Sequence, residues 1–332
     1  MNDSVLVVGA YGYGNVGDEA ILAGLLSRLD RRRVTVMSRA PRETAAAHAV
    51  RAIGIGRALP ALLTHRTVVI GGGGVFGRDM GRIGRLLPAF GLLAKAFRRR
   101  VTVEGVDLDT RLSASARLLV PNLLRACETV SVRDRASAAI AREWGVAVEV
   151  LPDLSSRMSP AAPETGRRAL ARIGLDTQRP IVGLALTAVN HALADDVLEA
   201  TIRTIHALPE AQFVFVPMSR HPRVAVHDDV QFALRIARSA PLSILEEPLP
   251  PREMLAVFGQ LTAVVAMRYH AMLFAARCGT PLIPIPYAEK TERWLVEHGR
   301  RGVPAEPEAL ISAARDALEA ARAPNPPLLV AS

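Results

Sequence analysis

The chain has 332 residues, a length that predicts two domains rather than one. Half of the residues are hydrophobic but only 4% are aromatic, so Ala, Leu and Val must fill the cores. No run of 18 apolar residues is free of charge, and residues 1–4 lack the basic segment of a secretory signal. We therefore expect neither a membrane-spanning helix nor a secreted protein.

The formal net charge is +9, and all but two of the 41 basic residues are arginines. This excess reflects either a general Arg and Ala bias or an anionic partner, which would be an anionic substrate or a lipid surface. Nucleic acid is disfavoured, because no recognised module is present and few aromatics lie near the basic clusters. Cys127 and Cys278 lie in apolar stretches, which predicts buried thiols in a reducing, cytoplasmic compartment.

The first predicted elements are a strand, a glycine-rich turn and a helix. Residues 5–8 form a short apolar run, as in a strand buried on both faces. Four glycines then occur between residues 9 and 17, and helical periodicity begins at Ile21. A glycine turn that leads into a helix N-terminus is a general anion site.

The same turn, Gly12-Tyr-Gly-Asn-Val-Gly17, also matches the dinucleotide fingerprint, and Ser38-Arg39 would suit a 2′-phosphate. We disfavour a dinucleotide because Asp18 and Glu19 directly follow the third glycine and would repel a pyrophosphate. These two acids either complement the helix dipole or place a carboxylate at the mouth of a cleft. There it would hold a sugar hydroxyl or act as a base.

Apolar strands alternate with amphipathic helices along the rest of the first half, which predicts a parallel α/β sheet. The expected strands are 34–37, 51–55, 67–70, 101–106, 129–132 and 146–151. Gly71-Gly72-Gly73-Gly74 follows a buried strand and is interpreted as a binding loop at the carboxyl edge of the sheet, or else as a flexible connector.

Residues 78–100 are apolar in the middle and flanked by arginines. Pro88 and Gly91 are expected to interrupt any helix there. The stretch is either a core helix with a solvated basic end or an interfacial patch that contacts a membrane surface.

Arg133 follows the strand 129–132. Its guanidinium either binds a phosphate or carboxylate through two N–H groups or forms a structural ion pair with the neighbouring Asp134. The last strand of this half ends near Asp153. The Ser-, Pro- and Ala-rich residues 155–165 predict a linker. We therefore expect two Rossmann-like lobes, 1–158 and 166–322, with a central cleft between their carboxyl edges and a Pro-rich tail at 323–332.

The second half repeats the alternation, with strands expected at 181–186, 212–217, 242–245, 262–266 and 282–285. His221 follows one of these strands and lines the cleft or is solvated. Arg268 and His270 end another strand and open a helix, where a guanidinium, an imidazole and helix N–H groups would suit a small dianion. His270 as a core histidine and Lys290 as a surface lysine are the alternatives.

Four blocks in this order resemble the polysaccharide pyruvyl transferase family. They are Tyr11-Gly-Tyr-Gly-Asn-Val-Gly-Asp-Glu-Ala-Ile-Leu22, Gly71–Gly74 with the following Val-Phe-Gly-Arg-Asp79, Ser131-Val-Arg-Asp-Arg-Ala-Ser137, and Arg268-Tyr-His270 with Gly279-Thr-Pro281 and Tyr287-Ala-Glu-Lys290. The resemblance is to the cell-surface anchoring type, which pyruvylates a cell-wall polymer. It implies an α/β fold of the two-lobed GT-B type. Tyr269 departs from the family pattern, where an aliphatic residue is frequent.

The resemblance also implies transfer of a pyruvyl group from phosphoenolpyruvate to a sugar that is expected to be lipid-linked. His270 would be the acid, with Lys290 in reserve, and Asp18 or Glu19 the base. Arg133, Arg268, His270 and Lys290 would bind the donor. The acceptor side would be lined by Asn15, Gly17, Asp18, Gly72, Gly73, Gly74, Asp153 and His221. No metal or cofactor is implied beyond phosphoenolpyruvate as co-substrate. The rivals are a glycosyltransferase that uses a nucleotide sugar and a non-catalytic, membrane-associated sugar binder.

Overall fold

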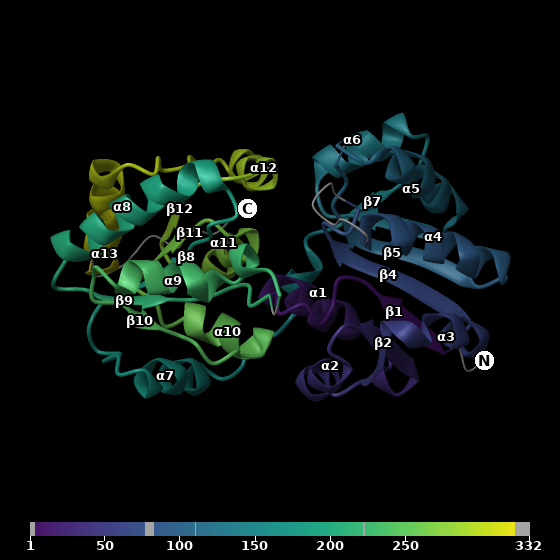
Figure 1. The fold of residues 1–332 in the computed structure, drawn as a ribbon, viewed down its shortest axis with the longest axis horizontal. Helices are drawn as coiled ribbons and strands as arrows, with labels where there is room; N and C mark the ends of the chain where they lie inside the picture. The colour runs from purple at the N-terminus through teal and green to yellow at the C-terminus, as the bar shows by residue number, and fades with distance from the viewer. Residues whose placement is uncertain (1–3, 77–82, 110, 222, 323–332) are drawn as a thin grey trace. The chain divides into compact units, whose positions relative to one another are not determined.

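The computed structural model describes residues 4–76, 83–109, 111–221 and 223–322 (Figure 1). The chain forms two compact units, and the sequence passes from one unit to the other more than once. Unit 1 comprises residues 4–13 and 18–158, whereas unit 2 comprises residues 14–17 and everything from Ser159 onward. A short piece of the glycine-rich turn therefore belongs to the unit that the second half of the chain builds. The tail at 323–332 and residues 77–82 lie outside the described residues.

Unit 1 contains a seven-stranded parallel sheet in the order β3-β2-β1-β4-β5-β6-β7. The strands are β1 (Val5–Val8), β2 (Val34–Ser38), β3 (Arg51–Gly54), β4 (Thr67–Gly73), β5 (Arg100–Val106), β6 (Thr129–Val132) and β7 (Glu149–Val150). Its helices are α1 (Val16–Leu26), α2 (Pro41–His48), α3 (Ala58–Thr64), α4 (Ile83–Ala96), α5 (Ala114–Ala126) and α6 (Arg135–Glu143). The β1 side chains alternate between two cores, Leu6 and Val8 in one and Val7 in the other, because helices cover both faces of the sheet.

Unit 2 contains a five-stranded parallel sheet in the order β10-β9-β8-β11-β12. The strands are β8 (Ile181–Ala185), β9 (Gln212–Phe215), β10 (Ser243–Ile244), β11 (Ala263–Ala266) and β12 (Leu282–Pro284). The helices are α7 (Pro163–Arg172), α8 (His191–Ala207), α9 (Asp229–Ala237), α10 (Pro251–Phe258), α11 (Tyr269–Cys278), α12 (Glu289–Glu297) and α13 (Pro307–Arg322).

Both sheets share one topology. The strand that comes first in the chain lies inside the sheet, and the strand order reverses direction beside it. The reversal falls between β1 and β4 in unit 1 and between β8 and β11 in unit 2. Open α/β sheets bind ligands outside the carboxyl ends of the strands at such a point. The glycine-rich turn follows β1, and Arg268 and His270 follow β11, so each unit carries predicted site residues at its own reversal.

Two expectations about unit 1 are wrong in detail. Three of the four glycines at 71–74 belong to β4 rather than to a loop, with Gly71 opposite Glu104 and Gly73 opposite Val106. A Cβ on Gly72 would lie 2.3 Å from the Ile21 Cγ2 atom, so the absence of a side chain there serves packing against α1.

The second difference is that α4 continues through both Pro88 and Gly91. At Gly91 a Cβ would lie 2.6 Å from the Leu123 Cδ1 atom, so the glycine permits close packing of α4 on α5. The two cysteines are free and only half-buried. Burial raises the pKa of Cys127 to about 12 and that of Cys278 to about 11, which keeps both thiols protonated and unreactive. None of the described helices is long and apolar enough to cross a bilayer.

Candidate functional site

The reversal point of unit 2 is built around a buried ion pair. Arg268 is the N-cap residue of α11, and its guanidinium donates two hydrogen bonds to the two carboxylate oxygens of Asp229. The Asp229 side chain is only 1% exposed, and it also accepts hydrogen bonds from the backbone N–H groups of Met218 and Ser219 at 3.1 and 3.0 Å. These four donors keep the buried carboxylate charged and fix the plane of the guanidinium.

The protonation of Arg268 is secured by its neighbours. Burial alone would lower the pKa of this guanidinium, but the Asp229 carboxylate and the Tyr287 hydroxyl raise it, and the net shift is upward. Burial raises the pKa of Asp229, and Arg268 with the Ser219 and Met218 amides opposes that shift. Arg268 is therefore a permanent, oriented cation at the end of β11.

The segment Gly14–Gly17 of the glycine-rich turn is fastened beside this pair within unit 2. Its Val16 N–H donates to the Met218 carbonyl at 2.9 Å, and the Arg220 N–H donates to the Gly14 carbonyl at 2.8 Å. Asn15 forms an isolated antiparallel bridge with Ser219, and its Oδ1 accepts from the Gly17 N–H at 2.9 Å. Met218 and Ser219 are the residues whose amides hold Asp229, so one short loop organises both features.

His270 lies in the first turn of α11, where it is half-buried and packs against Gly17. A Cβ on Gly17 would lie 2.0 Å from His270 Nδ1, closer than any real side chain can approach. The Tyr269 ring stands edge-on to the imidazole with centroids 5.3 Å apart. Unit 2 thus brings together four of the sequence-predicted site residues: Asn15, Gly17, Arg268 and His270.

We expect Gly17→Ala to lower turnover by about 100-fold, because a displacement of about 1 Å at a catalytic group has that order of cost. Gly259→Ala is the matched control in unit 2, since its Cβ would meet nothing closer than 3.6 Å. Steady-state kinetics of both folded variants measure the effect. Equal activity in Gly17→Ala and Gly259→Ala would show that the contact with His270 is not needed.

Lys290 and His221 lie at the same carboxyl edge of unit 2, on separate elements. Lys290 is exposed in the first turn of α12, three residues after Tyr287. Sequence reasoning expected a loop there, but α12 begins at Glu289, and the Thr291 hydroxyl closes its first turn by donating to the Ala288 carbonyl at 2.6 Å. The Nδ1 atom of His221 accepts from the backbone N–H groups of Arg223 and Val224, which shapes the loop after β9.

In unit 1, the two acids after the glycine-rich turn have different surroundings. Glu19 accepts from the Gly12 N–H at 2.8 Å through one oxygen and contacts His48 Nε2 at 2.8 Å through the other. Asp18 lies against the end of β4, where a Cβ on Gly73 would be 3.3 Å from its Oδ1. Glu19 therefore holds the turn in shape, and Asp18 is the better candidate for a base.

We expect Asp18→Asn to lower turnover by about 100-fold or more, the scale of a lost general base, with little change in stability. Glu19→Gln should leave turnover within a few-fold and lower the free energy of unfolding by about 1 kcal/mol, because its charge-assisted bonds to Gly12 and His48 weaken. Kinetics and denaturant unfolding of the two variants check this. The reverse pattern would move the base to Glu19.

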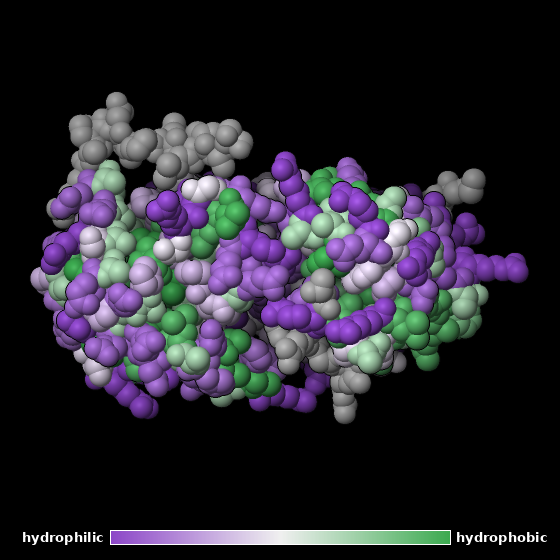
Figure 2. Space-filling model, turned by 90° about the horizontal axis from the view of Figure 1, so that it is seen from above, coloured by the Kyte–Doolittle hydropathy of each residue, from purple (hydrophilic) through white to green (hydrophobic). Residues whose placement is uncertain are grey.

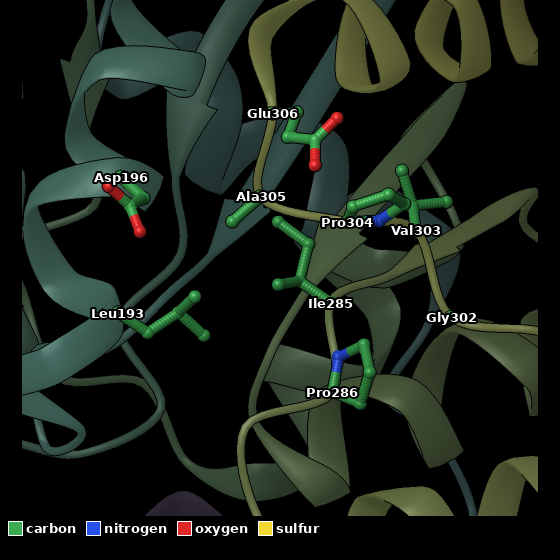
Figure 3. A pocket seen from close by; sticks show the side chains of 9 residues that line it. All are labelled: Leu193, Asp196, Ile285, Pro286, Gly302, Val303, Pro304, Ala305 and Glu306. Carbon is green, nitrogen blue, oxygen red and sulfur yellow. The ribbon is translucent and has the colours of Figure 1, made fainter.

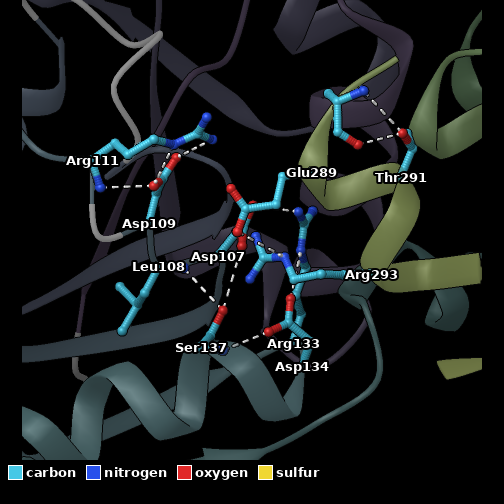
Figure 4. A network of polar contacts seen from close by, with 11 residues as sticks. Asp107, Leu108, Asp109, Arg111, Arg133, Asp134, Ser137, Glu289, Thr291 and Arg293 are labelled. Carbon is cyan, nitrogen blue, oxygen red and sulfur yellow. Dashed lines mark hydrogen bonds and ion pairs between the residues drawn. The ribbon is translucent and has the colours of Figure 1, made fainter. Parts of the chain in front are cut away.

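Arg133 is the centre of a buried network in unit 1 rather than an open anion site (Figure 4). Its side chain is 3% exposed and donates to Asp107 at 2.6 Å, with Asp153 at 3.6 Å and Asp134 at 3.8 Å. Ser137 joins the network by donating to the Asp107 carboxylate and accepting from the Leu108 N–H. Three carboxylates surround this one guanidinium, so Arg133 and Asp153 belong to a buried ion network and do not form an open anion site.

Beneath β4 lies the buried phenol of Tyr11. Its hydroxyl has no hydrogen-bond partner among the described residues, and a Cβ on Gly71 would lie 2.3 Å from it. Burial raises the pKa of this hydroxyl far above its usual range, and the charges of Asp18, Glu19 and Glu104 raise it further. Tyr11 is therefore a neutral donor at any physiological pH, never a base.

Unit 2 also holds a hollow of about 490 Å³ beyond the end of β12, shown in Figure 3. Its lining is mainly apolar, with two carboxylates facing it, and comprises Leu193, Asp196, Ile285, Pro286, Gly302, Val303, Pro304, Ala305 and Glu306. None of the sequence-predicted site residues lines it, and its two carboxylates would repel an anionic donor. Within the described part of the chain, no group of three or more His, Cys, Asp or Glu side chains could hold a metal ion.

Sequence reasoning missed Asp229 and His48, the partners of Arg268 and Glu19. Asp229 follows another aspartate and opens α9, so by sequence it is an ordinary helix-start residue. Its burial is the informative property, and sequence alone does not show that Asp229 would be buried beside Arg268, 39 residues further along the chain. The Tyr287–Lys290 block did contain the Arg268 partner Tyr287, but nothing in the block distinguished Tyr287 from its neighbours.

Comparison with solved structures shows the fold. The chain is similar to a UDP-GlcNAc 2-epimerase from Methanocaldococcus jannaschii, with a TM-score of 0.65, 14% identity and coverage of 95% of this chain and 92% of that one. A Neisseria meningitidis UDP-GlcNAc 2-epimerase bound to UDP-GlcNAc is similar with a TM-score of 0.68 and 11% identity, over 95% of this chain and 91% of that one. Anabaena Alr3699/HepE in complex with UDP and glucose is similar with a TM-score of 0.64 and 15% identity, over 96% of this chain and 90% of that one. The α/β fold with two parallel sheets is therefore GT-B-like, as expected.

Comparison with protein families and curated proteins gives one match. No curated protein matched the chain. The model of the family described as polysaccharide pyruvyl transferase matches residues 15–289, a span that includes the described segments around Asn15, Arg133, Arg268 and His270. The chain belongs to the polysaccharide pyruvyl transferase family.

Proposed function

We propose that the protein transfers a pyruvyl group from phosphoenolpyruvate to a sugar of a lipid-linked cell-wall polysaccharide precursor, as in the cell-surface anchoring type of the family. Family membership supports the reaction class. The observation that carries the donor assignment is the Arg268–Asp229–Tyr287 arrangement, which holds a charged guanidinium beside His270 at the N-terminus of α11. The two free cysteines and the donor fit a cytoplasmic reaction at the inner face of the membrane.

The donor carries a carboxylate and a phosphate, and the cations must hold both. Arg268 keeps N–H donors beyond its bonds to Asp229 and Tyr287, since a guanidinium has five donors. The N–H groups at the start of α11 and the Lys290 ammonium add positive potential at the same edge of unit 2. This arrangement stabilises the phosphate as it leaves with the bonding electrons.

His270 is the proposed acid in the first step. Its imidazolium proton is transferred to the methylene carbon of the enol, which becomes a methyl group, and the neighbouring carbon is attacked by one sugar hydroxyl. Phosphate then leaves, a second hydroxyl of the same sugar closes the ketal, and the hydroxyl protons pass to base. Asp18 is the proposed first base for the sugar hydroxyl. Lys290 is the reserve acid.

A glycosyltransferase that uses a nucleotide sugar is the alternative. The observation in its favour is that the structures named above include one bound to UDP-GlcNAc and one with UDP and glucose. Arg268 and Lys290 would then hold the diphosphate. Those likenesses lie at 11–15% identity, whereas the family match concerns this sequence directly.

Thermal-shift titration separates the two functions. We expect phosphoenolpyruvate to raise the melting temperature and UDP-sugars to leave it unchanged, because a ligand stabilises the state that binds it. An Arg268→Lys variant should lose the shift, since a lysine cannot keep both the fork to Asp229 and a ligand contact. A shift produced by UDP-sugars alone would favour the glycosyltransferase.

A further inference from the structure

The helices α3, α4 and α5 expose an apolar face that the proposed reaction does not use. The exposed positions described on α4 are Leu86, Ala89, Leu93 and Ala96, and Phe97 directly follows the helix, so the side that normally carries polar residues is apolar. We define the outer face as the large exposed residues of the three helices and the turn after α4. They are Leu59 (60% exposed), Leu63 (62%), Leu86 (66%), Leu93 (37%), Phe97 (46%) and Leu118 (66%).

Two of these helices, α4 and α5, pack together, and a hydrogen bond links the turn after α4 to the end of α3. Gly91 of α4 fits against Leu123 of α5, and the Arg99 guanidinium donates to the Leu63 carbonyl at the end of α3 at 3.2 Å. In the view of Figure 2, green hydrophobic residues beside purple hydrophilic ones gather at the right-hand end, over unit 1. Scattered apolar residues are normal on a surface, whereas a large exposed apolar patch is typical of an interaction site.

Basic residues predominate around the outer face. None of the three helices contains an Asp or Glu, and the only acid in the turns that directly follow them is Glu128, which Lys95 neutralises at 2.8 Å. Arginines on these helices or in the segments that flank them include Arg57, Arg66, Arg98, Arg99, Arg100, Arg117 and Arg125. Apolar side chains surrounded by cations form the pattern of a surface that binds anionic lipid.

Arg98 carries a further sign of selection for charge. It follows α4 in the left-handed region at φ 56°, a conformation that glycine adopts without cost and other residues do not. Arginine therefore occupies this position despite the backbone preference, and its side chain is exposed.

We propose that the outer face of α3, α4 and α5 docks the protein on an anionic lipid surface, with the leucines and Phe97 inserted at the level of the headgroups and the arginines on the phosphates. A second copy of the chain fits less well, because a two-fold contact would place the same arginines against each other. The face belongs entirely to unit 1, and its assignment does not depend on the identity of the pyruvyl donor.

Sedimentation with vesicles tests the proposal. The wild-type protein should sediment with an equal mixture of phosphatidylcholine and phosphatidylglycerol, and not with phosphatidylcholine alone. Phe97→Ser combined with Leu63→Ser should lower the partition coefficient about tenfold or more, because both side chains leave the lipid. Arg98→Gly should lower it about fivefold, the scale of one basic residue near a charged membrane, while it relieves the backbone and so preserves the fold.

Matched controls lie in unit 2, where Leu234→Ser removes a leucine that is 40% exposed and Arg168→Gln removes an exposed arginine. Both should bind vesicles as the wild type does. Failure of the wild type to bind anionic vesicles, or equal losses in the control variants, would overturn the proposal. So would a wild-type dimer that Phe97→Ser dissociates, since the face would then be a subunit interface.

Discussion

Replacing His270 by alanine is expected to lower turnover by about 10²–10⁴-fold, the range of a lost general acid. The residue is half-buried at the start of α11, and its ring packs on Gly17, so its removal breaks no contact with another side chain at that position. The substitution should therefore leave the melting temperature nearly unchanged. Release of phosphate from phosphoenolpyruvate in the presence of acceptor measures the loss.

His206→Ala is the matched control, because this histidine is exposed on α8 and contacts only the Ser239 carbonyl at 2.8 Å among the interactions seen for it. It should retain wild-type turnover. Unchanged phosphate release in His270→Ala would end the assignment of His270 as the acid and would transfer that role to Lys290. Loss in both variants would point to a general effect on unit 2.

Replacing Asp229 by alanine is expected to lower the free energy of unfolding by about 3–5 kcal/mol, the cost of leaving a buried charge without its partner. Arg268 would keep its burial but lose both hydrogen bonds, and the amides of Met218 and Ser219 would lose their acceptor. For a unit of this size the melting temperature should fall on the order of 10 °C. Denaturant unfolding and calorimetry measure the two quantities.

Two comparisons sharpen this test. Asp195→Ala breaks the pair with Arg235, in which the aspartate side chain is 86% exposed, and should cost less than about 1 kcal/mol. The double variant Asp229→Ala with Arg268→Met should recover much of the lost stability, because no unpaired charge remains, yet stay inactive. Equal costs in Asp229→Ala and Asp195→Ala would mean that the Arg268 pair is not the buried anchor described here.

The alternation of buried runs with helical periods predicted most strands of both sheets, because strands buried on two faces are nearly continuous runs of Val, Ile, Leu and Ala. The strands predicted at 67–70 and 262–266 are of this kind, and their positions placed Gly71 and Arg268 at the correct edge of each sheet. The ends of helices were harder to predict from the sequence. The continuation of α4 through Pro88 accompanies packing against α5, as of Gly91 on Leu123, which no local pattern contains.

The glycines of unit 1 and the Gly14–Gly17 segment show what sequence could not supply. Glycine next to a strand end suits a ligand loop and also suits a helix packed close to a strand, and Gly72 belongs to the second case. Gly14–Gly17 is adjacent to β1 in sequence but is bonded to the loop after β9. Which residues hold Arg268 and Glu19 likewise depended on contacts between segments distant in the chain, and only the structure provides these.

The most direct measurement is transfer of label from phosphoenolpyruvate, carrying carbon label in its pyruvyl group, to a panel of lipid-linked disaccharides, with inorganic phosphate measured in the same samples. The proposal predicts that one acceptor gains the label as a ketal that acid removes, with one phosphate released for each group transferred. Labelled phosphoenolpyruvate that stays intact with every acceptor, while UDP-sugars yield UDP and a longer oligosaccharide, would contradict it.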